Sequence, residues 1–405
     1  MSNLFNKKLR NLRLRFNFAI ARFYRRFLRK YGKINSSVFL FCSSPDYSDN
    51  AKALYLYMLN NKPWAEYNLF FVVKELNLCK EHFANEKIFF ISSKNNYGGV
   101  PLRNLKLLLT AGTIFYTHSA PFPCEKQFAL KEQRYINLWH GCGYKDNENK
   151  GHNRICTFDK ALVPGPLFKL AKMKFWNAPS ERILVCGYPR YDWILNPSKE
   201  AHSFSENIRN GRSKLVIWMP TFRNDKYNRL NETSSIKQFP LISNDMQWYD
   251  LDSFCKHLNL VLLIKLHQFQ KDYLIDFKAF SNIKILNNND LICNNVNLYE
   301  LLPKTDALIS DYSSVAIDYL IINRPIAFCL QDFEEYKKLR GFIFKNPKEF
   351  MPGHHLYTFD DLIGFLNDIA YSKDKFEKQR KEMCKIAITD SSCYCENLLK
   401  ILELH

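Results

Sequence analysis

The chain has 405 residues, which exceeds one ordinary hydrophobic core, so two domains of roughly 150–200 residues each are expected. Hydrophobic residues make up 46% of the chain and charged residues 24%, a composition that excludes an intrinsically disordered protein. The net charge of +18 is unevenly placed, because eleven basic residues and no acidic residue lie within residues 1–33.

This basic segment has the pattern of an amphipathic helix. Its apolar residues recur every three or four positions, which places them on one helical face; they are Phe5, Leu9, Leu12, Phe16, Ile20, Phe23, Phe27 and Tyr31. Such a helix would lie on an anionic membrane surface, with basic side chains at the headgroups and aromatic side chains among the acyl chains. Two alternatives stay open: the apolar face packs on the protein body, or the segment is an RNA-binding arm.

We expect neither a membrane-spanning segment nor a cleavable signal peptide. No stretch of about 18 uncharged apolar residues occurs, and arginines interrupt the apolar residues near the N-terminus. The 12 cysteines are scattered without a C-x-x-C pair, which is typical of a reduced, cytosolic protein. The sequence therefore predicts a peripheral protein at the cytoplasmic face of the cell membrane.

After Gly32, short apolar segments alternate with longer helical patterns, which predicts an α/β fold with parallel sheets covered by helices. The polar run at residues 196–214 is the best candidate for a linker. We therefore predict two doubly wound, Rossmann-like domains, residues 34–200 and 201–405, that face each other across a cleft. The expected strands lie at 38–44, 68–75, 87–93, 113–119, 135–141, 159–165, 182–189, 214–223, 258–267, 282–287, 306–314 and 324–330.

Ligands of such sheets bind beyond the carboxyl ends of the strands, where this sequence carries a histidine in each half. His140 follows an apolar strand in the segment 137–145, and we include its neighbours Trp139, Gly141 and Lys145 as candidate substrate-binding residues. His267 follows a strand in the second half. Two histidines that face each other from opposite domains suit a base-assisted transfer. The alternative is that each histidine only makes structural hydrogen bonds.

Residues 306–328 read as a strand, a polar turn, a helix and a second strand. Ser313 and Ser314 would lie at the start of that helix, where free amides and hydroxyls suit a phosphate or diphosphate. A plain helix cap is the alternative. Asp318 would orient a binding group, although Asp311 could equally do so by capping.

Further strand ends supply cations and small polar groups. Arg190 follows the strand at 182–189, Lys265 precedes His267, and Pro220, Thr221 and Arg223 end the strand at 214–223. Guanidinium groups bind phosphate in a bidentate fashion, so these residues suit a diphosphate, although each could be a solvated surface cation. Neither GxxxxGK nor GxGxxG occurs, which argues against a P-loop nucleotidase and a dinucleotide enzyme.

Taken in order, these segments resemble the motif series of the CDP-glycerol:poly(glycerophosphate) glycerophosphotransferase family, which includes the teichoic acid primases and polymerases. The matching segments span residues 44 to about 353, and any one of them is weak, but seven in the right order are highly specific. They are residues 44–58, 137–145, 187–192, 219–223, 264–268, the run from Asp311, and 340–342 with 352–353.

The resemblance implies a glycosyltransferase-B-like (GT-B-like) fold, CDP-glycerol as the donor, a polyprenyl-linked or other lipid-linked glycan as the acceptor, and catalytic roles for His140 and His267. The family commonly has Thr-Pro where this chain has Cys142-Gly143, and a proline where it has Gln268. These departures leave the donor polyol open. We expect a chain without the extra N-terminal domain of the long polymerases, similar to the short, primase-like members.

The resemblance implies that an acceptor hydroxyl attacks the glycerol-bearing phosphorus and CMP departs, with His140 as our preferred base. We expect no cofactor and no protein-bound metal, because no carboxylate cluster occurs; any Mg²⁺ would sit on the donor phosphates. Three alternatives stay open: a CDP-ribitol or other polyol-phosphate transferase, a nucleotide-sugar glycosyltransferase, and a basic membrane- or nucleic-acid-binding protein. We do not expect nucleic acid among the partners.

Overall fold

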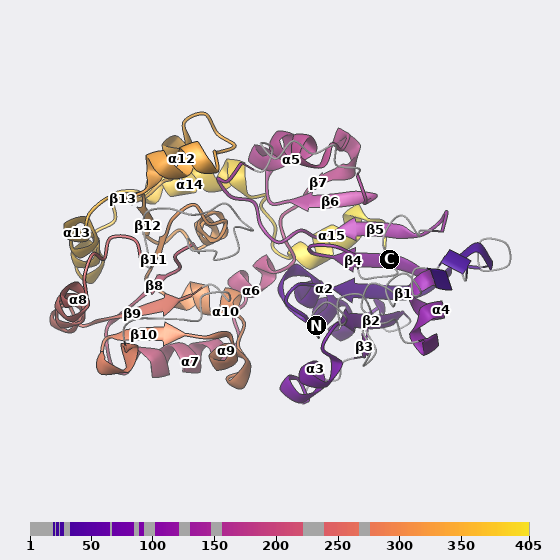
Figure 1. Ribbon diagram of the computed structural model, residues 1–405, viewed down its shortest axis with the longest axis horizontal. Coiled ribbons are helices and arrows are strands. Elements are labelled where there is room, and N and C mark those ends of the chain that lie inside the picture. The colour runs from indigo at the N-terminus through magenta and orange to yellow at the C-terminus, as the bar shows by residue number, and fades with distance from the viewer. Residues whose placement is uncertain are drawn as a thin grey trace, which may run out of the picture.

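Two parallel sheets stand side by side in the computed structural model, with helices around each (Figure 1). The structure describes residues 19–20, 22–23, 25–27, 33–64, 67–84, 89–92, 102–120, 130–146, 156–221, 239–266 and 276–404. The predicted α/β fold of two doubly wound units is confirmed.

The first sheet has seven parallel strands in the order β3-β2-β1-β4-β5-β6-β7. Apolar runs form these strands because helices cover both faces of the sheet, and in β4 all six residues are buried. The strands are β1 (Asn35–Cys42), β2 (Asn68–Val73), β3 (Phe90–Ser92), β4 (Ala111–Tyr116), β5 (Arg134–Asn137), β6 (Lys160–Val163) and β7 (Ile183–Val185).

The second sheet has six parallel strands in the order β10-β9-β8-β11-β12-β13. Five of them were expected from the sequence; the edge strand β13 was not, because it has only three residues and two are histidines. The strands are β8 (Lys214–Trp218), β9 (Leu260–Lys265), β10 (Ile283–Leu286), β11 (Ala307–Ser310), β12 (Ile326–Cys329) and β13 (His354–Leu356).

Helices connect the strands and cover the sheets, as parallel pairing requires. In the first half they are α2 (Asp49–Asn60), α3 (Leu76–His82), α4 (Leu102–Thr110), α5 (Lys169–Trp176) and α6 (Tyr191–Leu195). In the second half they are α7 (Lys199–Arg209), α8 (Met246–His257), α9 (Asn288–Cys293), α10 (Leu298–Leu301), α11 (Val315–Asp318), α12 (Phe333–Leu339), α13 (Phe359–Ala370), α14 (Glu377–Ala387) and α15 (Tyr394–Ile401).

The linker predicted at residues 196–214 is wrong, because most of this run is helix α7. Ser198 caps the helix by accepting a hydrogen bond from the amide of Ala201. Ala201, Ser205 and Ile208 are buried, and α7 packs against strands β8 and β9. The helix therefore belongs to the second unit. The segment that connects the two units is shorter than the 19-residue linker expected from the sequence.

The C-terminal helix returns to the first unit. In Figure 1, α15 lies beside the first sheet, and it contacts α2 and α6. The carboxylate of Asp192 accepts hydrogen bonds from the amides of Tyr394 (2.5 Å) and Cys395 (2.9 Å), and Arg134 donates to the carbonyl of Leu402 (2.7 Å). The division at residue 200 did not anticipate this return, which ties the two units together a second time.

Apart from the extra strand β7 in the first sheet, the two sheets have the same strand order, which places a topological switch point in each. Strand order reverses between β1 and β4 in the first sheet and between β8 and β11 in the second. Ligands of doubly wound sheets bind just beyond the carboxyl ends of the strands at such points. One continuous hydrophobic core joins the units and holds these two edges in place.

Most of the predicted basic helix at residues 1–33 lies outside the described residues. The described positions between 19 and 27 are helical, with the side chains of Phe23 and Phe27 exposed. The membrane role of this segment stays a prediction. Within the described part of the chain, no helix is long and apolar enough to cross a membrane.

Candidate active site

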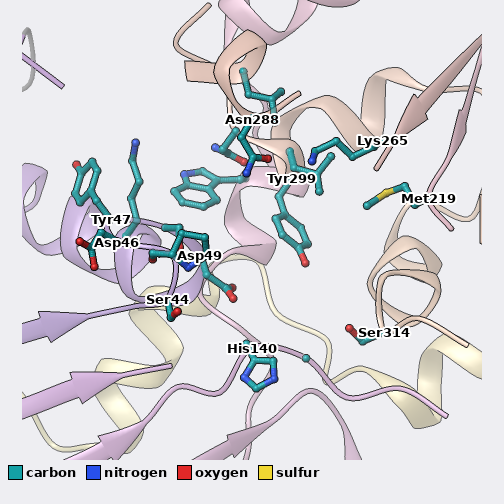
Figure 2. A pocket seen from close by; sticks show the side chains of 18 of the residues that line it. Ser44, Asp46, Tyr47, Asp49, His140, Met219, Lys265, Asn288, Tyr299 and Ser314 are labelled. Carbon is teal, nitrogen blue, oxygen red and sulfur yellow. The ribbon is translucent and has the colours of Figure 1, made fainter. Parts of the chain in front are cut away.

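A cavity of about 1280 Å³ lies between the carboxyl ends of the two sheets (Figure 2). The first unit contributes the turn after β1 and the loop after β5, and the second unit contributes the segments after β8, β9 and β11. Ligand sites usually enclose about 300–1,000 Å³, so this space can hold two substrates together. Its lining includes Asp49, Trp139, His140, Gly141, Lys145, Pro220, Thr221, Lys265, Ser313 and Ser314.

His140 lies at the floor of this cavity, on a loop that the fold constrains at several points. Trp139 and Gly141 on either side of it have φ angles of 55° and 146°. The buried side-chain amide of Asn50 donates hydrogen bonds to the carbonyls of Leu138 (3.1 Å) and Trp139 (2.9 Å). The loop is therefore held in a shape that strand geometry alone would not produce.

The surroundings of the His140 imidazole favour its uncharged form and one of its two tautomers. Burial lowers its pKa to about 3, with a further lowering by His118 and by the cations Lys172 and Arg190, against the opposing hydrogen bond to Thr117. Its Nδ1 lies 3.4 Å from the Thr117 carbonyl, which can only accept, so this long contact favours the tautomer with the hydrogen on Nδ1. Nε2 then keeps its lone pair and can accept a proton.

The loop around His140 meets the second unit at Ser314. A side chain at Gly141 would collide with the Ser314 hydroxyl, and one at Gly143 would come within 3.0 Å of the Ser314 backbone. Helix α11 after Ser314 has only four residues, and the Ser314 side chain makes no capping hydrogen bond. A serine cap is therefore not its role. Ser313 and Ser314 line the cavity, and Figure 2 shows Ser314 on the side of the second unit, across from His140.

Arg190 does not line the cavity, although the sequence placed it among the phosphate-binding cations. Its guanidinium is 1% exposed and donates to Asp49 (2.6 Å), Asp318 (2.7 Å) and the His140 carbonyl (2.9 Å). Burial alone would lower the pKa of Arg190, but Asp318 and Asp49 raise it well above its usual value. Arg190 is already paired with both carboxylates, and its role is to support the His140 loop from outside the cavity.

Asp318 joins the units by accepting from Arg190 and from two tyrosine hydroxyls. The hydroxyl of Tyr191 lies 2.6 Å from one carboxylate oxygen, and that of Tyr299 lies 3.0 Å from the other. Asp311 has a similar structural position, because it accepts from the Thr221 amide (2.7 Å) and the Thr221 hydroxyl. Neither acid lines the cavity; they orient neighbours that do.

Lysines from both units also reach the cavity. Lys265, at the end of β9, donates to the Leu266 carbonyl (3.1 Å), and burial lowers its pKa against an opposing effect of Asp290. Lys145 forms an isolated antiparallel bridge with Phe342, which brings the 340–342 segment to the cavity. His267 and Arg223 lie outside the described residues. Across the described ranges, no three His, Cys, Asp or Glu side chains gather as a metal site.

Sequence reasoning missed several residues of this site. Asp49 and Asn50 lie in the segment 44–58, which carried the resemblance but no predicted role. Tyr299 comes from helix α10 and has no strand-end position to reveal it. His118 follows β4 as His140 follows β5, so the strand-end rule could have found it. Its ring stacks on that of His140 with the centroids 4.0 Å apart.

Comparison with known proteins agrees with this geometry. The sequence profile of the CDP-Glycerol:Poly(glycerophosphate) glycerophosphotransferase family matches residues 22–392. A teichoic acid glycerol-phosphate primase of Bacillus subtilis (strain 168) is 25% identical over 415 residues, covering 98% of this chain and 97% of that protein. A teichoic acid poly(glycerol phosphate) polymerase of Staphylococcus epidermidis is 28% identical over 298 residues, and the match spans 66% of this chain but only 37% of the polymerase.

The fold is also found among solved structures. A structure of the wall teichoic acid polymerase TagF superimposes with a TM-score of 0.70 at 22% identity, covering 100% of this chain and 98% of that chain. This likeness supports the GT-B-like arrangement of the two sheets. Since the family profile matches nearly the whole sequence, the chain belongs to the CDP-glycerol:poly(glycerophosphate) glycerophosphotransferase family.

Proposed function

We propose that this chain transfers glycerol phosphate from CDP-glycerol to a hydroxyl of a lipid-linked glycan and releases CMP. The observation that carries the proposal is one cavity in which an uncharged histidine from the first unit faces hydroxyls and a lysine from the second. A solved structure of a TagF variant with CDPG matches this chain with a TM-score of 0.71 at 21% identity, which supports the fold of such a site.

The reaction needs one general base, which takes the proton of the hydroxyl on the acceptor substrate. The acceptor hydroxyl gives its proton to Nε2 of His140 while its oxygen bonds to the glycerol-bearing phosphorus. The bond from that phosphorus to the bridging oxygen breaks, and the electron pair leaves with CMP. A phosphate monoester has a second pKa of about 6, so CMP can depart without a proton at neutral pH.

Charge on the diphosphate would be balanced from the second unit. The hydroxyls of Ser313 and Ser314 and the ammonium group of Lys265 line the cavity and can donate to phosphate oxygens. Lys145 reaches the same space from the first unit. Binding roles for His267 and Arg223 remain part of the proposal, without support from the described residues. The proposal includes no protein-bound metal or cofactor; Mg²⁺ would enter with the donor phosphates.

The lipid-linked acceptor would approach at the cytoplasmic face of the membrane. Residues 1–33 carry eleven basic residues, and each cation near an anionic surface contributes on the order of 1 kcal/mol. We propose that this segment keeps the enzyme beside its acceptor. Deletion of residues 1–33 should abolish sedimentation with vesicles containing anionic lipid while CDP-glycerol binding persists.

A polyol other than glycerol is the second candidate. A teichoic acid poly(ribitol-phosphate) polymerase of Bacillus spizizenii is 23% identical over 380 residues, and the match spans 85% of this chain and 53% of that protein. The cavity is wide enough for either polyol. The donor must therefore be chosen by experiment.

The test is nucleotide release from a donor panel. CDP-glycerol, CDP-ribitol and a set of nucleotide sugars are incubated with the full chain and a synthetic polyprenyl-diphosphate disaccharide acceptor. We expect CMP from CDP-glycerol, reduced about 100- to 10,000-fold by His140→Asn, which removes the general base. His202→Asn, at an exposed histidine on α7, is the matched control. Release from nucleotide sugars alone, or normal turnover by His140→Asn, would refute the proposal.

A further inference from the structure

A second histidine, His118, lies flat against His140. Strands β4 and β5 are neighbours in the sheet, with Tyr116 paired to Asn137 in register. The segments that follow β4 and β5 therefore leave the sheet edge side by side, which brings together the imidazoles of His118 and His140. Their ring centroids are 4.0 Å apart and their planes differ by 7°.

A second ring, that of Trp139, also packs against His140. The Trp139 ring lies 4.1 Å from it, centroid to centroid, at 38°. Trp139 is itself fixed, because its indole nitrogen donates to the Gly141 carbonyl (2.6 Å) and the Lys172 ammonium lies 4.6 Å from the centre of its ring. The His140 imidazole is therefore restrained by contacts with two aromatic rings while it lines the cavity.

Thr117 connects the two histidines. Its hydroxyl lies 2.9 Å from Nδ1 of His118, and its carbonyl lies 3.4 Å from Nδ1 of His140. Thr117 thus contacts both rings, the ring of His118 through its hydroxyl and the ring of His140 through its carbonyl. The long contact to His140 is weak alone, since hydrogen bonds at this length contribute little. Stacking on His118 supplies the missing restraint on the orientation of His140.

Two imidazoles in face contact cannot readily both carry a positive charge. His118 is exposed at the surface, but its packing against neighbouring groups partly desolvates the ring and lowers its pKa, with Asp49 opposing and Lys74 adding to the effect. Lys172 and Arg190 face His140 and also disfavour its protonation. The surroundings of the pair therefore favour the state in which both rings are neutral.

We propose that His118 is a positioning residue for the transfer: it fixes the plane of the His140 ring and keeps Nε2 unprotonated until the acceptor hydroxyl arrives. The inference rests on the proposed function, because it assigns His118 to the base of that reaction. His118 itself touches no reacting atom in this account.

Two substitutions separate its two effects. His118→Phe keeps a flat ring against His140 but removes the titratable partner, whereas His118→Asn removes the ring. The first should keep kcat for CMP release within about threefold of the wild type. The second should lower kcat by about tenfold or more at unchanged KM for CDP-glycerol, because displacing a base by about 1 Å can cost up to 100-fold. His202→Asn is again the control.

The pH arm uses the free protein, with histidine ring carbons labelled for NMR and the His140 signal assigned from His140→Asn. In the wild type, the protonation midpoint of His140 should lie well below the value of a free imidazole. Both His118 variants should raise this midpoint toward the ordinary histidine value of about 6.5. A purely structural role for His118 predicts no such movement in the folded His118→Phe protein.

The outcomes distinguish this inference from the function it rests on. If the midpoint of His140 is the same in both variants as in the wild type, or if His118→Asn keeps wild-type kcat while folded, the inference is wrong. If the donor panel shows no CMP release but the midpoint moves as expected, the coupled pair is real and the proposed function fails instead.

Discussion

Asp318→Asn should destabilise the protein strongly, because it removes one charge from a buried ion pair that joins the two units. Arg190 and Asp318 are each 1% exposed at their side chains, and Nη2 lies 2.7 Å from Oδ2. The substitution preserves shape, so packing is kept. The amide oxygen can still accept from Tyr191 or Tyr299, but the charge that balances the guanidinium is lost.

The size of the effect follows from burial. Two unit charges at this distance attract by roughly 6 kcal/mol at an effective dielectric constant of about 20. Removing one partner of a buried pair typically costs about 3–5 kcal/mol, because the other charge stays buried. Asp49 still pairs with Arg190 at 2.6 Å, which keeps the loss near the lower end, at about 3 kcal/mol.

The assay is urea unfolding followed by tryptophan fluorescence and circular dichroism. Glu396→Gln is the matched control, since it makes the same carboxylate-to-amide change in the exposed pair with Lys400, whose atoms are 2.6 Å apart. Exposed pairs contribute less than about 1 kcal/mol, so this variant should unfold almost as the wild type does. Equal stabilities of Asp318→Asn and Glu396→Gln would refute the structural role assigned to the Arg190 network.

Four further predictions concern the site. Burial lowers the pKa of His140 to about 3. kcat/KM for CDP-glycerol should therefore stay level from about pH 7 to about pH 5, where an ordinary histidine would be mostly protonated, and a half-loss near pH 6.5 would contradict this. The same shift should cost stability as the pH falls from about 6.5 toward 3, because the unfolded chain binds the proton that the buried ring does not. Gly141→Ala should raise KM for CDP-glycerol and destabilise the protein by about 1–3 kcal/mol, because φ is 146° and the new methyl group meets Ser314. The control Gly364→Ala, within a helix and with open space around it, should be neutral or stabilising. A lower melting temperature for Gly364→Ala than for Gly141→Ala would contradict the conformation described for the His140 loop. Lys265→Met should weaken CDP-glycerol binding about 10- to 100-fold in calorimetry while leaving thermal stability intact, and unchanged affinity would remove Lys265 from the site.

The strands were readable from sequence because each is an apolar run buried on both faces. β8 and β9 lie inside the expected segments 214–223 and 258–267, and Thr221 and Lys265 after or at their ends line the cavity. The strand-end rule located His140, Lys265 and Ser314 for the same reason: the carboxyl ends of parallel strands must meet at one edge.

Other features depended on partners that are distant in sequence. An arginine after a strand looks the same whether it binds a ligand phosphate or two carboxylates, and the second carboxylate of Arg190 lies at residue 318. The sequence of helix α7 resembles a linker because most of its residues are polar. Only Ala201, Ser205 and Ile208 are buried, and two of these are small. Their spacing of four and three was nevertheless the helical signal.

The most direct test of the central claim is a crystal structure of His140→Asn with bound CDP-glycerol. We expect the diphosphate to bind in the cavity between the sheets, in contact with Ser314 and Lys265. The glycerol-bearing phosphorus should lie within about 6 Å of the side chain at residue 140, which leaves room for one attacking hydroxyl. A diphosphate bound elsewhere, or one held with that phosphorus turned away from residue 140, would contradict it.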